Sequence, residues 1–425
     1  MLFDPDGFIG TLLAIEGISD ARAVLNGPTG CRGNPAYFSD RHFPRENSLN
    51  RRSFEEPFFF GQSRIPCTYL DRDDYIMGSG EKLTSILRLI AEMGDTFLAI
   101  VNSPGACLIG DDLNRFLVNF SLANRCMAIE SAAYSRPFAA GFDDTIAAIL
   151  RWLRLNKLQQ LRNRVNLLGI SMYQKYWQGN IAEIRHLCHL MGLEVVSIPG
   201  GGCSVAQLRE SVTASYNIVI FPEYAKKTAS FYEKEFDIPA IYPPCGSPVG
   251  FGPTEEWIKT VARVTKQNPT QALDYMKEKR THAYHQLSRF HHEKGYPKGA
   301  TFAIRADSSF VYPLTVWLYE YLGMLPVSVS CVDGWDTHMV QALKTFLRNN
   351  NLLHCYEADI RKTYCHLFFG DSLTGKDLEL SGTCKKSVEI FNRTTNDHYF
   401  IERSFLGGGG ALWVLDYVFE AIRCE

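Results

Sequence analysis

Three cysteines near the N-terminus lie in turns whose composition suits metal or redox chemistry. Cys31 stands in NGPTGCR (26–32), where two glycines permit tight backbone angles and a proline stiffens the turn. Cys67 precedes an acidic run, and Cys107 follows a Pro-Gly turn in VNSPGACLIGDDL (101–113). Cysteine thiolates on separate loops of one domain hold iron–sulfur clusters in this way, without close sequence spacing. The alternative is a set of ordinary tight turns with buried cysteines.

Other motifs in this region favour structural roles. No CxxC pair occurs in the chain, which disfavours a zinc ribbon or a thioredoxin-like site. The segment GSGEKL (78–83) lacks the Walker spacing and the Ser or Thr after its lysine, so we do not expect it to bind phosphates. The acidic run at Asp71, Asp73 and Asp74 is expected to form a solvated turn.

Two further cysteines and a group of histidines are weaker candidates. Cys203 follows three glycines and Cys245 lies in PPCGSP, so both are expected on loops, where packing is favoured over a role in a pocket. A polar helix expected over 271–295 carries histidines that suit a solvated face better than a metal site, namely His282, His285, His291 and His292.

The bulk composition predicts a globular chain without affinity for polyanions. The chain has 425 residues, is 46% hydrophobic and carries a formal net charge of −2, so no basic field attracts nucleic acid or anionic lipid. Its twelve cysteines are scattered and do not form a disulfide framework. The N-terminus lacks a signal-peptide pattern, and no run of about twenty apolar residues occurs. We therefore expect a cytoplasmic protein with reduced thiols and no membrane span.

Strands alternate with helices through the middle and the last part of the chain. The expected strands are 166–170, 195–202 with its glycine turn, 217–223, 238–243, 300–307, 324–331 and 363–372. The expected helices are 181–192, 205–215, 224–236, 254–264 with Thr254 at its start, 312–323 and 336–349. This alternation predicts two doubly wound units with parallel sheets and right-handed crossovers.

The first part of the chain is also expected to be α/β, with longer irregular stretches. A helix is expected over 81–94, ending at Gly94, and a strand over 96–105 with its turn. Residues 35–66 have no clean period and are expected to form a functional loop or an interaction surface, with the aromatic FFFGQ (58–62) as a core or subunit contact. The tail (407–424) is expected to be a glycine turn that opens an apolar helix.

The chain resembles the nitrogenase component 1 family along essentially its whole length. The resemblance rests on motifs in a fixed order: GISD followed by NGPTGC, then DRDDYIMGSGEKL, then IGDDL. It continues through YWQGNIAEIRHLCHLMGLEVVSIPGGGCS, NIVIFPE and PVGFGPTEEWI, and ends with SFLGGGGALWVLDYVF. The family includes nitrogenase subunits, cofactor-assembly scaffolds and tetrapyrrole reductases such as those of protochlorophyllide.

This resemblance implies an α/β fold with three Rossmann-like, doubly wound, parallel-sheet domains. We place them at 1–160, which carries the cysteines, at 161–268, and at 269–425, with the C-terminal helix packing back. It also implies a homodimer, heterodimer or heterotetramer with a homologous second subunit, an iron–sulfur centre at the subunit interface, and an ATP-dependent iron-protein reductase as electron donor.

The resemblance assigns cluster ligands residue by residue. Cys31 stands at the family's Gly-Pro-x-Gly-Cys ligand position. Asp6 stands where the family has an earlier cysteine, and either a ligand or a helix-capping carboxylate fits there. Pro104 takes the place of the family's third cysteine, from which Cys107 is displaced, and Cys67 lies in a loop where only some members carry a cysteine. A [4Fe–4S] cluster held by three cysteines, and completed by a partner subunit, fits this pattern.

The catalytic cofactor of nitrogenase requires a cysteine and a histidine that this chain lacks. By the resemblance, the cysteine would stand near Phe221, where Pro222 and Glu223 follow, and the histidine near Leu406. We therefore expect no iron–molybdenum-type cofactor. The resemblance implies a nitrogenase-like oxidoreductase component that takes electrons through the interface cluster and reduces a small or tetrapyrrole-like substrate. The alternative is a non-catalytic scaffold that binds a metallocluster or a tetrapyrrole.

Overall fold

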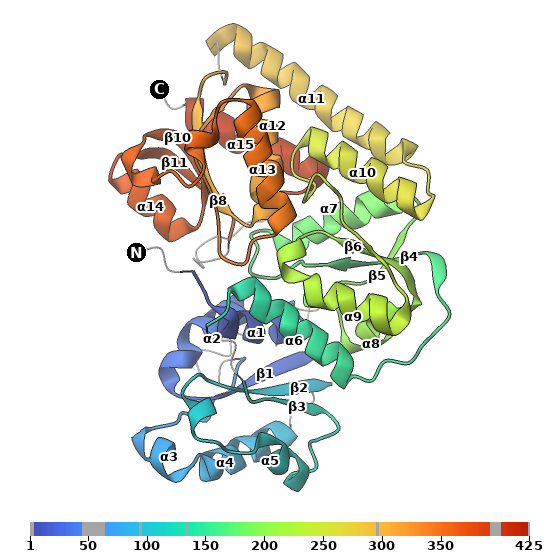
Figure 1. The fold of residues 1–425 in the computed structure, drawn as a ribbon, viewed down its shortest axis with the longest axis vertical. Coiled ribbons are helices and arrows are strands. Elements are labelled where there is room, and N and C mark those ends of the chain that lie inside the picture. The colour runs from blue at the N-terminus through green and yellow to red at the C-terminus, as the bar shows by residue number, and fades with distance from the viewer. Residues whose placement is uncertain are drawn as a thin grey trace. The chain divides into compact units, whose positions relative to one another are not determined.

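The structure is a computed structural model of the chain, and it describes residues 4–44, 64–92, 96–131, 135–294, 297–391 and 401–423. The chain divides into two compact units. The N-terminal unit contains residues 3–158 and 197–212, and the C-terminal unit contains 159–196 and 213–425. Figure 1 shows each unit as sheets flanked by helices. None of the described helices is both long and apolar enough to cross a membrane.

The N-terminal unit is built on one three-stranded sheet in the order β1-β2-β3. Its strands are β1 (Ala21–Asn26), β2 (Phe97–Asn102) and β3 (Cys126–Ile129). Its α-helices are α1 (Gly7–Glu16), α2 (Thr29–His42), α3 (Arg72–Met77), α4 (Gly80–Ala91), α5 (Leu113–Asn119), α6 (Phe138–Trp152) and α8 (Val205–Glu210). The strands run parallel, so their carboxyl ends meet at one edge of the sheet.

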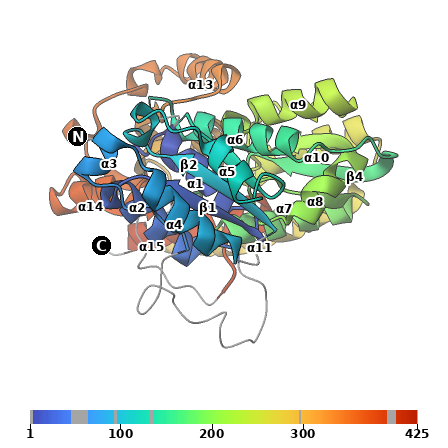
Figure 2. The ribbon, with the colours of Figure 1, turned by 90° about the horizontal axis from the view of Figure 1, so that it is seen from below.

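Hydrophobic periodicity explains how this sheet is covered. In α4, apolar side chains recur at helical spacing from Leu83 through Leu87 to Ile90, and all are buried. They pack with residues of α5 against Val24 and Ile100 of the sheet. Figure 1 shows α1 and α6 on the opposite face, and Figure 2 looks onto α4 and α5. Burial on both faces accounts for strands that are almost continuously apolar.

Helices α1 and α6 cross at close range because glycines face backbone at the contact. A Cβ on Gly10 would lie 2.2 Å from the carbonyl oxygen of Phe138, and a Cβ on Gly141 would lie 2.0 Å from that of Gly7. The hydroxyl of Thr145 is 3.0 Å from that of Thr11 across the same contact. No larger side chain than glycine fits at these two positions without a backbone shift.

The C-terminal unit contains two four-stranded sheets, in the orders β5-β4-β6-β7 and β11-β10-β8-β9. The central sheet has β4 (Leu161–Leu168), β5 (Glu194–Ser197), β6 (Ala214–Val219) and β7 (Ala240–Ile241), with α7 (Trp177–Leu190), α9 (Lys226–Phe236) and α10 (Phe251–Thr265). The third sheet has β8 (Thr301–Ala306), β9 (Leu325–Cys331), β10 (Cys365–Gly370) and β11 (Cys384–Glu389). Its helices are α11 (Thr270–Lys294), α12 (Ser308–Leu322), α13 (Thr337–Asn349), α14 (Ser372–Leu380) and α15 (Gly407–Arg423).

Three sheets of parallel strands flanked by helices confirm the α/β, Rossmann-like fold class predicted from the sequence. The three sheets lie in the three expected segments of the chain, while the domain limits themselves stay a prediction. The long polar helix expected over 271–295 is α11, and the strand–helix alternation from β4 onward follows the predicted order.

Several local predictions were wrong. Residues 35–42 were expected in a long irregular segment, yet they continue α2, which contains Pro35 within the helix. Glycines and a proline give α2 low intrinsic helix propensity, so only its tertiary contacts could identify it. Much of the remaining predicted loop, including FFFGQ (58–62), lies outside the described residues.

Three helix ends also differ from the prediction. Thr254 does not cap its helix, because α10 begins earlier, after Gly250, and the Thr254 hydroxyl donates back to the Gly250 carbonyl oxygen at 2.6 Å. The helix expected over 205–215 ends as α8 at Glu210, and its last two residues belong to β6. The glycines from 407 onward form the first turn of α15 instead of a preceding turn.

The α1–α6 crossing gives a first prediction. Gly141→Ala is expected to destabilise the protein by about 1–3 kcal/mol, because its methyl group would overlap the Gly7 carbonyl. The free energy of unfolding in urea, followed by circular dichroism, measures the loss. Gly252→Ala is the matched control, since its Cβ in α10 would meet nothing within 4 Å and helix propensity favours alanine by up to about 1 kcal/mol. Equal losses for the two variants would contradict the close crossing.

Candidate functional site

The three predicted cysteines lie on segments at the carboxyl edge of the N-terminal sheet. Ligands of open parallel sheets bind at this edge, where the strands lead into turns. From β1 the chain enters α2, which carries Cys31 as its third residue. From β2 it enters the short 3-10 helix η2 (Ala106–Leu108), which carries Cys107.

Cys67 reaches the same edge on an extended segment that runs alongside β1. The Leu25 amide donates to the Pro66 carbonyl at 2.8 Å, and the Thr68 amide donates to the Leu25 carbonyl at 3.0 Å. These bonds extend the sheet by one short bridge, parallel to β1 at Leu25. The Cys67 side chain is thereby fixed beside the turn that precedes Cys31.

Buried polar groups hold this edge together. The Asn26 side-chain amide donates to the Asn102 side-chain oxygen at 2.9 Å, which joins the last residues of β1 and β2. The Thr68 hydroxyl donates to the Asn26 side-chain oxygen at 2.9 Å and accepts from the Gly27 amide at 2.9 Å. All of these groups are buried, so each lost bond would leave an unsatisfied polar atom. The positions of both cysteine-bearing segments are therefore tied to the sheet.

The Cys67 thiol is itself hydrogen-bonded. It donates to the Gly27 carbonyl at 3.1 Å and accepts from the Tyr69 amide at 3.4 Å. Burial raises the pKa of this thiol, while the Tyr69 amide and the nearby Arg32 charge oppose the rise. The amide and the guanidinium are the groups that would stabilise a thiolate at this position.

Asp6, Cys31 and Cys67 form one electrostatic group. Burial raises the pKa of the Cys31 thiol, and the Asp6 carboxylate raises it further. The charge of Cys31 in turn raises the pKa of Cys67. Asp6 also caps α1 by accepting from the Ile9 amide at 3.1 Å, which fulfils the alternative role that the sequence left open for it. The structure thus brings together three of the four predicted site residues.

Tyr75 is a further member of this group that the sequence did not single out. Burial raises the pKa of its phenol, and both thiols, Cys31 and Cys67, contribute to the rise. A Cβ on Gly105 would lie 2.9 Å from the Tyr75 hydroxyl oxygen, so this glycine makes room for the ring. No spacing rule connects Tyr75 to either cysteine, and only the fold reveals their electrostatic interaction.

Cys107 lies on the turn after β2 but is engaged elsewhere. Its thiol donates to the carbonyl oxygen of Glu130, at the end of β3, at 2.8 Å. In the part of the chain that the structure describes, no group of three or more Cys, His, Asp or Glu side chains is arranged to hold a metal ion by itself. A cluster at this edge would need ligands beyond those that the described residues bring together.

The exposed acidic run that follows Cys67 caps the start of helix α3. Asp71 caps α3 by accepting from the Asp73 and Asp74 amides. Lys82 lies 2.7 Å from Asp71 and 2.6 Å from Asp74, and its hydrogen bond lowers the pKa of Asp71 to about 2. The acidic run, which was expected to form a solvated turn, therefore forms the capped first turn of α3, and Lys82 of α4 makes ion pairs with it.

Large apolar side chains are exposed on these same turns. Ile76 and Met77 at the end of α3 are 69% and 85% exposed, and Leu108 in η2 is 87% exposed. Apolar groups that gather on a surface next to candidate ligands are typical of a contact with another protein.

The weaker candidates, two cysteines and four histidines, are either buried in the core or exposed to solvent. Cys203 and Cys245 are buried, and burial raises the pKa of Cys203 to about 11, so both are inert thiols. The four histidines of α11, which are His282, His285, His291 and His292, are exposed on that helix and belong to no metal-binding group among the described residues.

In the C-terminal unit, the crevice near Phe221 and Leu406 is filled. It lies where β4, β6, β8 and β11 end, and its remaining cavity is about 10 Å³, roughly enough for one water molecule. Four aromatic side chains line it, namely Phe221, Phe310, Phe391 and Phe405. The Lys175 ammonium and the Glu389 carboxylate pair beside it at 2.6 Å. Among the described residues that line this pocket, the aromatic side chains leave space for no more than about one water molecule.

A buried carboxylate, Glu16, connects both cysteine-bearing segments to the sheet. It accepts from the Ala23 amide at 2.6 Å in β1 and from the Ser39 hydroxyl in α2. It also pairs with Arg64 at 2.7 Å, where the segment of Cys67 begins. No sequence pattern singles out Glu16, because its partners are brought to it only by the fold.

Comparison with known proteins gives a consistent result. A family model described as nitrogenase component 1 type oxidoreductase matches residues 7–418. A nitrogenase molybdenum-iron protein beta chain from Methanococcus maripaludis is 22% identical over 97% of this chain and 92% of its own. A subunit of the light-independent protochlorophyllide reductase from Chaetosphaeridium globosum is 24% identical over 59% of this chain and 48% of its own. A solved structure, nitrogenase Cp1 at pH 6.5, has the same fold, with a TM-score of 0.77 and 14% identity over 100% of this chain and 93% of that one.

The electrostatic group predicts how Cys31 titrates. Asp6→Asn is expected to lower the pH at which Cys31 becomes reactive, because the substitution removes the carboxylate that raises its pKa while asparagine still caps α1. Mass spectrometry of iodoacetamide-treated, metal-free protein over a pH series measures the midpoint. Asp112→Asn is the control, since Asp112 caps α5 in the same manner. An unchanged midpoint in Asp6→Asn would contradict the coupling.

The contacts of Glu16 lead to a prediction about the stability of the protein. Glu16→Ala is expected to cost about 3–5 kcal/mol, because it removes a buried carboxylate that pairs with Arg64 and accepts the Ala23 amide. Urea unfolding measures the change, and Glu92→Ala, at an exposed position after α4, serves as the control. A loss of less than about 1 kcal/mol would mean that Glu16 does not organise the two segments.

Proposed function

Because the chain belongs to the nitrogenase component 1 type oxidoreductase family, we propose that it is the electron-accepting and substrate-binding subunit of a two-component reductase. In this proposal, an ATP-dependent iron-protein reductase supplies the electrons, and an iron–sulfur cluster at a subunit interface receives them. The absence of a Walker motif from the sequence supports assigning ATP hydrolysis to the partner. The substrate is a small organic molecule, and the similarity to part of a protochlorophyllide reductase supports a tetrapyrrole-like class.

The observation that carries the proposal is the coupling of Cys31 with Cys67. These two thiols share one edge of the sheet and interact electrostatically, with Asp6 beside Cys31. A [4Fe–4S] cluster takes about four ligands. Two thiols from this chain therefore match half of a ligand set, and a second copy or a homologous subunit would supply the other half.

The surroundings of the thiols support this assignment. Thiolates must replace thiols when a cluster binds, so the raised pKa values mean that loading releases protons and is favoured as pH rises. The Tyr69 amide and the Arg32 guanidinium offset the negative charge. When bound, the cluster would supply one-electron transfer, and burial together with these donors would set its potential.

The exposed apolar side chains support an interface at this edge. Ile76, Met77 and Leu108 would be covered by the second subunit, which would also exclude water from the cluster. Cys107 lies on the same turns, and its thiol donates to the Glu130 carbonyl. We propose Cys31 and Cys67 as the ligands because these two thiols interact electrostatically, with Cys107 as a neighbour.

The filled crevice supports a reductase that works without an iron–molybdenum-type cofactor. No cysteine stands at Phe221 and no histidine at Leu406, and the remaining space there is about 10 Å³. Substrate reduction would then draw electrons from the interface cluster directly.

The test is the iron and acid-labile sulfide content, with an EPR spectrum, after anaerobic purification. About four irons per dimer are expected for the wild type. Cys31→Ala and Cys67→Ala should each lose the iron, whereas Cys107→Ala should keep it. Iron retained in both of the first two variants would overturn the ligand assignment, and an iron-free wild type reconstituted with its partner would overturn the redox function.

Turnover separates the proposed enzyme from a scaffold. With its iron protein, ATP and a reductant, the loaded protein should consume a candidate tetrapyrrole. Transfer of the intact cluster or pigment to another protein, without reduction, would identify a scaffold instead.

A further inference from the structure

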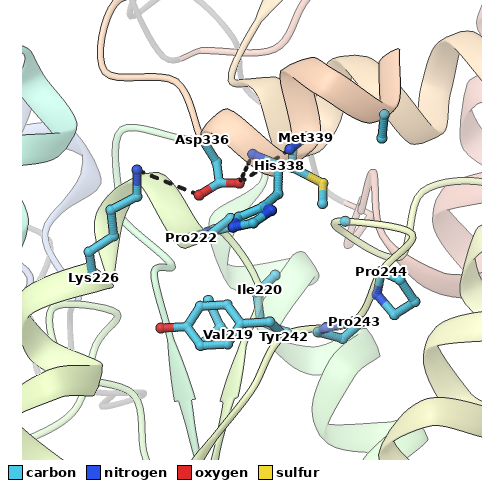
Figure 3. Close-up of a pocket in the computed structure, with 12 residues that line it drawn as sticks. Val219, Ile220, Pro222, Lys226, Tyr242, Pro243, Pro244, Asp336, His338 and Met339 are labelled. Carbon is cyan, nitrogen blue, oxygen red and sulfur yellow. Dashed lines mark hydrogen bonds and ion pairs between the residues drawn. The ribbon is translucent and has the colours of Figure 1, made fainter. Parts of the chain in front are cut away.

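A cavity of about 560 Å³ opens in the C-terminal unit where β6 and β7 end (Figure 3). Its size falls within the range of small-molecule sites. The wall comes from the ends of these two strands and from the first turns of α13. The residues that line this cavity differ from those that line the small pocket around Phe221.

The cavity has an apolar side and a polar side. Figure 3 places Pro243, Pro244 and Met339 on one side. The ammonium of Lys226 lies on the other side, near Asp336, and the hydroxyl of Tyr242 points to that side lower in the view. Such a wall accommodates an amphipathic molecule with an apolar body and one polar group.

The charges on the polar side leave Lys226 available to an anion. One oxygen of Asp336 accepts from the His338 and Met339 amides at 3.0 and 3.2 Å, so this carboxylate is committed to capping α13. Its other oxygen is 3.5 Å from the Lys226 nitrogen, and the Trp335 carbonyl is also 3.5 Å away. Both distances exceed the roughly 2.7–2.9 Å of a charge-assisted hydrogen bond.

A ligand carboxylate could approach Lys226 more closely than either of these groups does. The lysine side chain is 50% exposed, so the approach is open. The imidazole of His338 projects over the same space in the first turn of α13, where the helix dipole favours negative charge (Figure 3).

We propose that this cavity binds an organic acid, with an apolar ring system against the prolines and Met339 and a single anionic group at Lys226. The inference is independent of the proposed cluster, because it rests only on residues of the C-terminal unit. It adds a ligand site that the redox function does not require.

Paired fluorescent probes test both halves of the site. The anionic probe is 8-anilinonaphthalene-1-sulfonate, and the neutral probe is N-phenyl-1-naphthylamine, which has the same ring system without the sulfonate. The wild type should bind the anionic probe saturably. Lys226→Gln should lower the affinity for the anionic probe by about tenfold and change the affinity for the neutral probe by less than about twofold.

Two further variants locate the binding. Ala342→Trp, which places an indole in the cavity, should abolish binding of both probes. Lys227→Gln, at the next lysine, which does not line the cavity, should change neither affinity. Circular dichroism checks that each variant is folded, and Lys226→Gln decides the question if Ala342→Trp does not fold. Absence of saturable binding, or equal weakening of both probes by Lys226→Gln, would overturn the proposal.

Discussion

The buried carboxylate of Glu16 is the interaction on which the candidate site depends. It lies at the end of α1 and holds the first residues of β1, the middle of α2 and the start of the segment that carries Cys67. A single charge therefore joins three pieces of the chain, in addition to the bonds that tie the segment of Cys67 to β1. Because Arg64 and the Ser39 hydroxyl are its partners, the carboxylate is satisfied in an interior that would otherwise exclude it.

Pairs of buried asparagines on neighbouring strands fix the register in two of the sheets. Asn26 and Asn102 pair across β1 and β2, and Asn166 and Asn217 pair across β4 and β6, each with a side-chain bond of 2.9 Å. In both cases the two asparagines are directly opposite in the parallel register. A slip by one residue would bury two unpaired amides, which is far more costly than a slip in a purely apolar sheet.

The sequence predicted the fold better than the site. From β4 onward, apolar runs alternate with periodic helices, and these local patterns were sufficient to place the elements. Helix α2 was missed because Pro35 and its glycines oppose a helix that tertiary contacts impose. Cys31 and Cys67 were proposed individually as ligands from turn composition and family resemblance, and that role stays a prediction. Their coupling, and the part played by Tyr75, depend on long-range contacts that no periodicity encodes.

The aromatic filling of the crevice around Phe221 has a consequence for redesign. Introducing a cysteine there, with a histidine at Leu406, would restore ligands without restoring volume. Several phenylalanines would have to shrink together, and each truncation in a packed core costs about 3–5 kcal/mol. Each truncation would lower the stability of the protein until a metallocofactor occupied the space. A count of ligand substitutions therefore understates what such a redesign would need, because the volume would have to be opened as well.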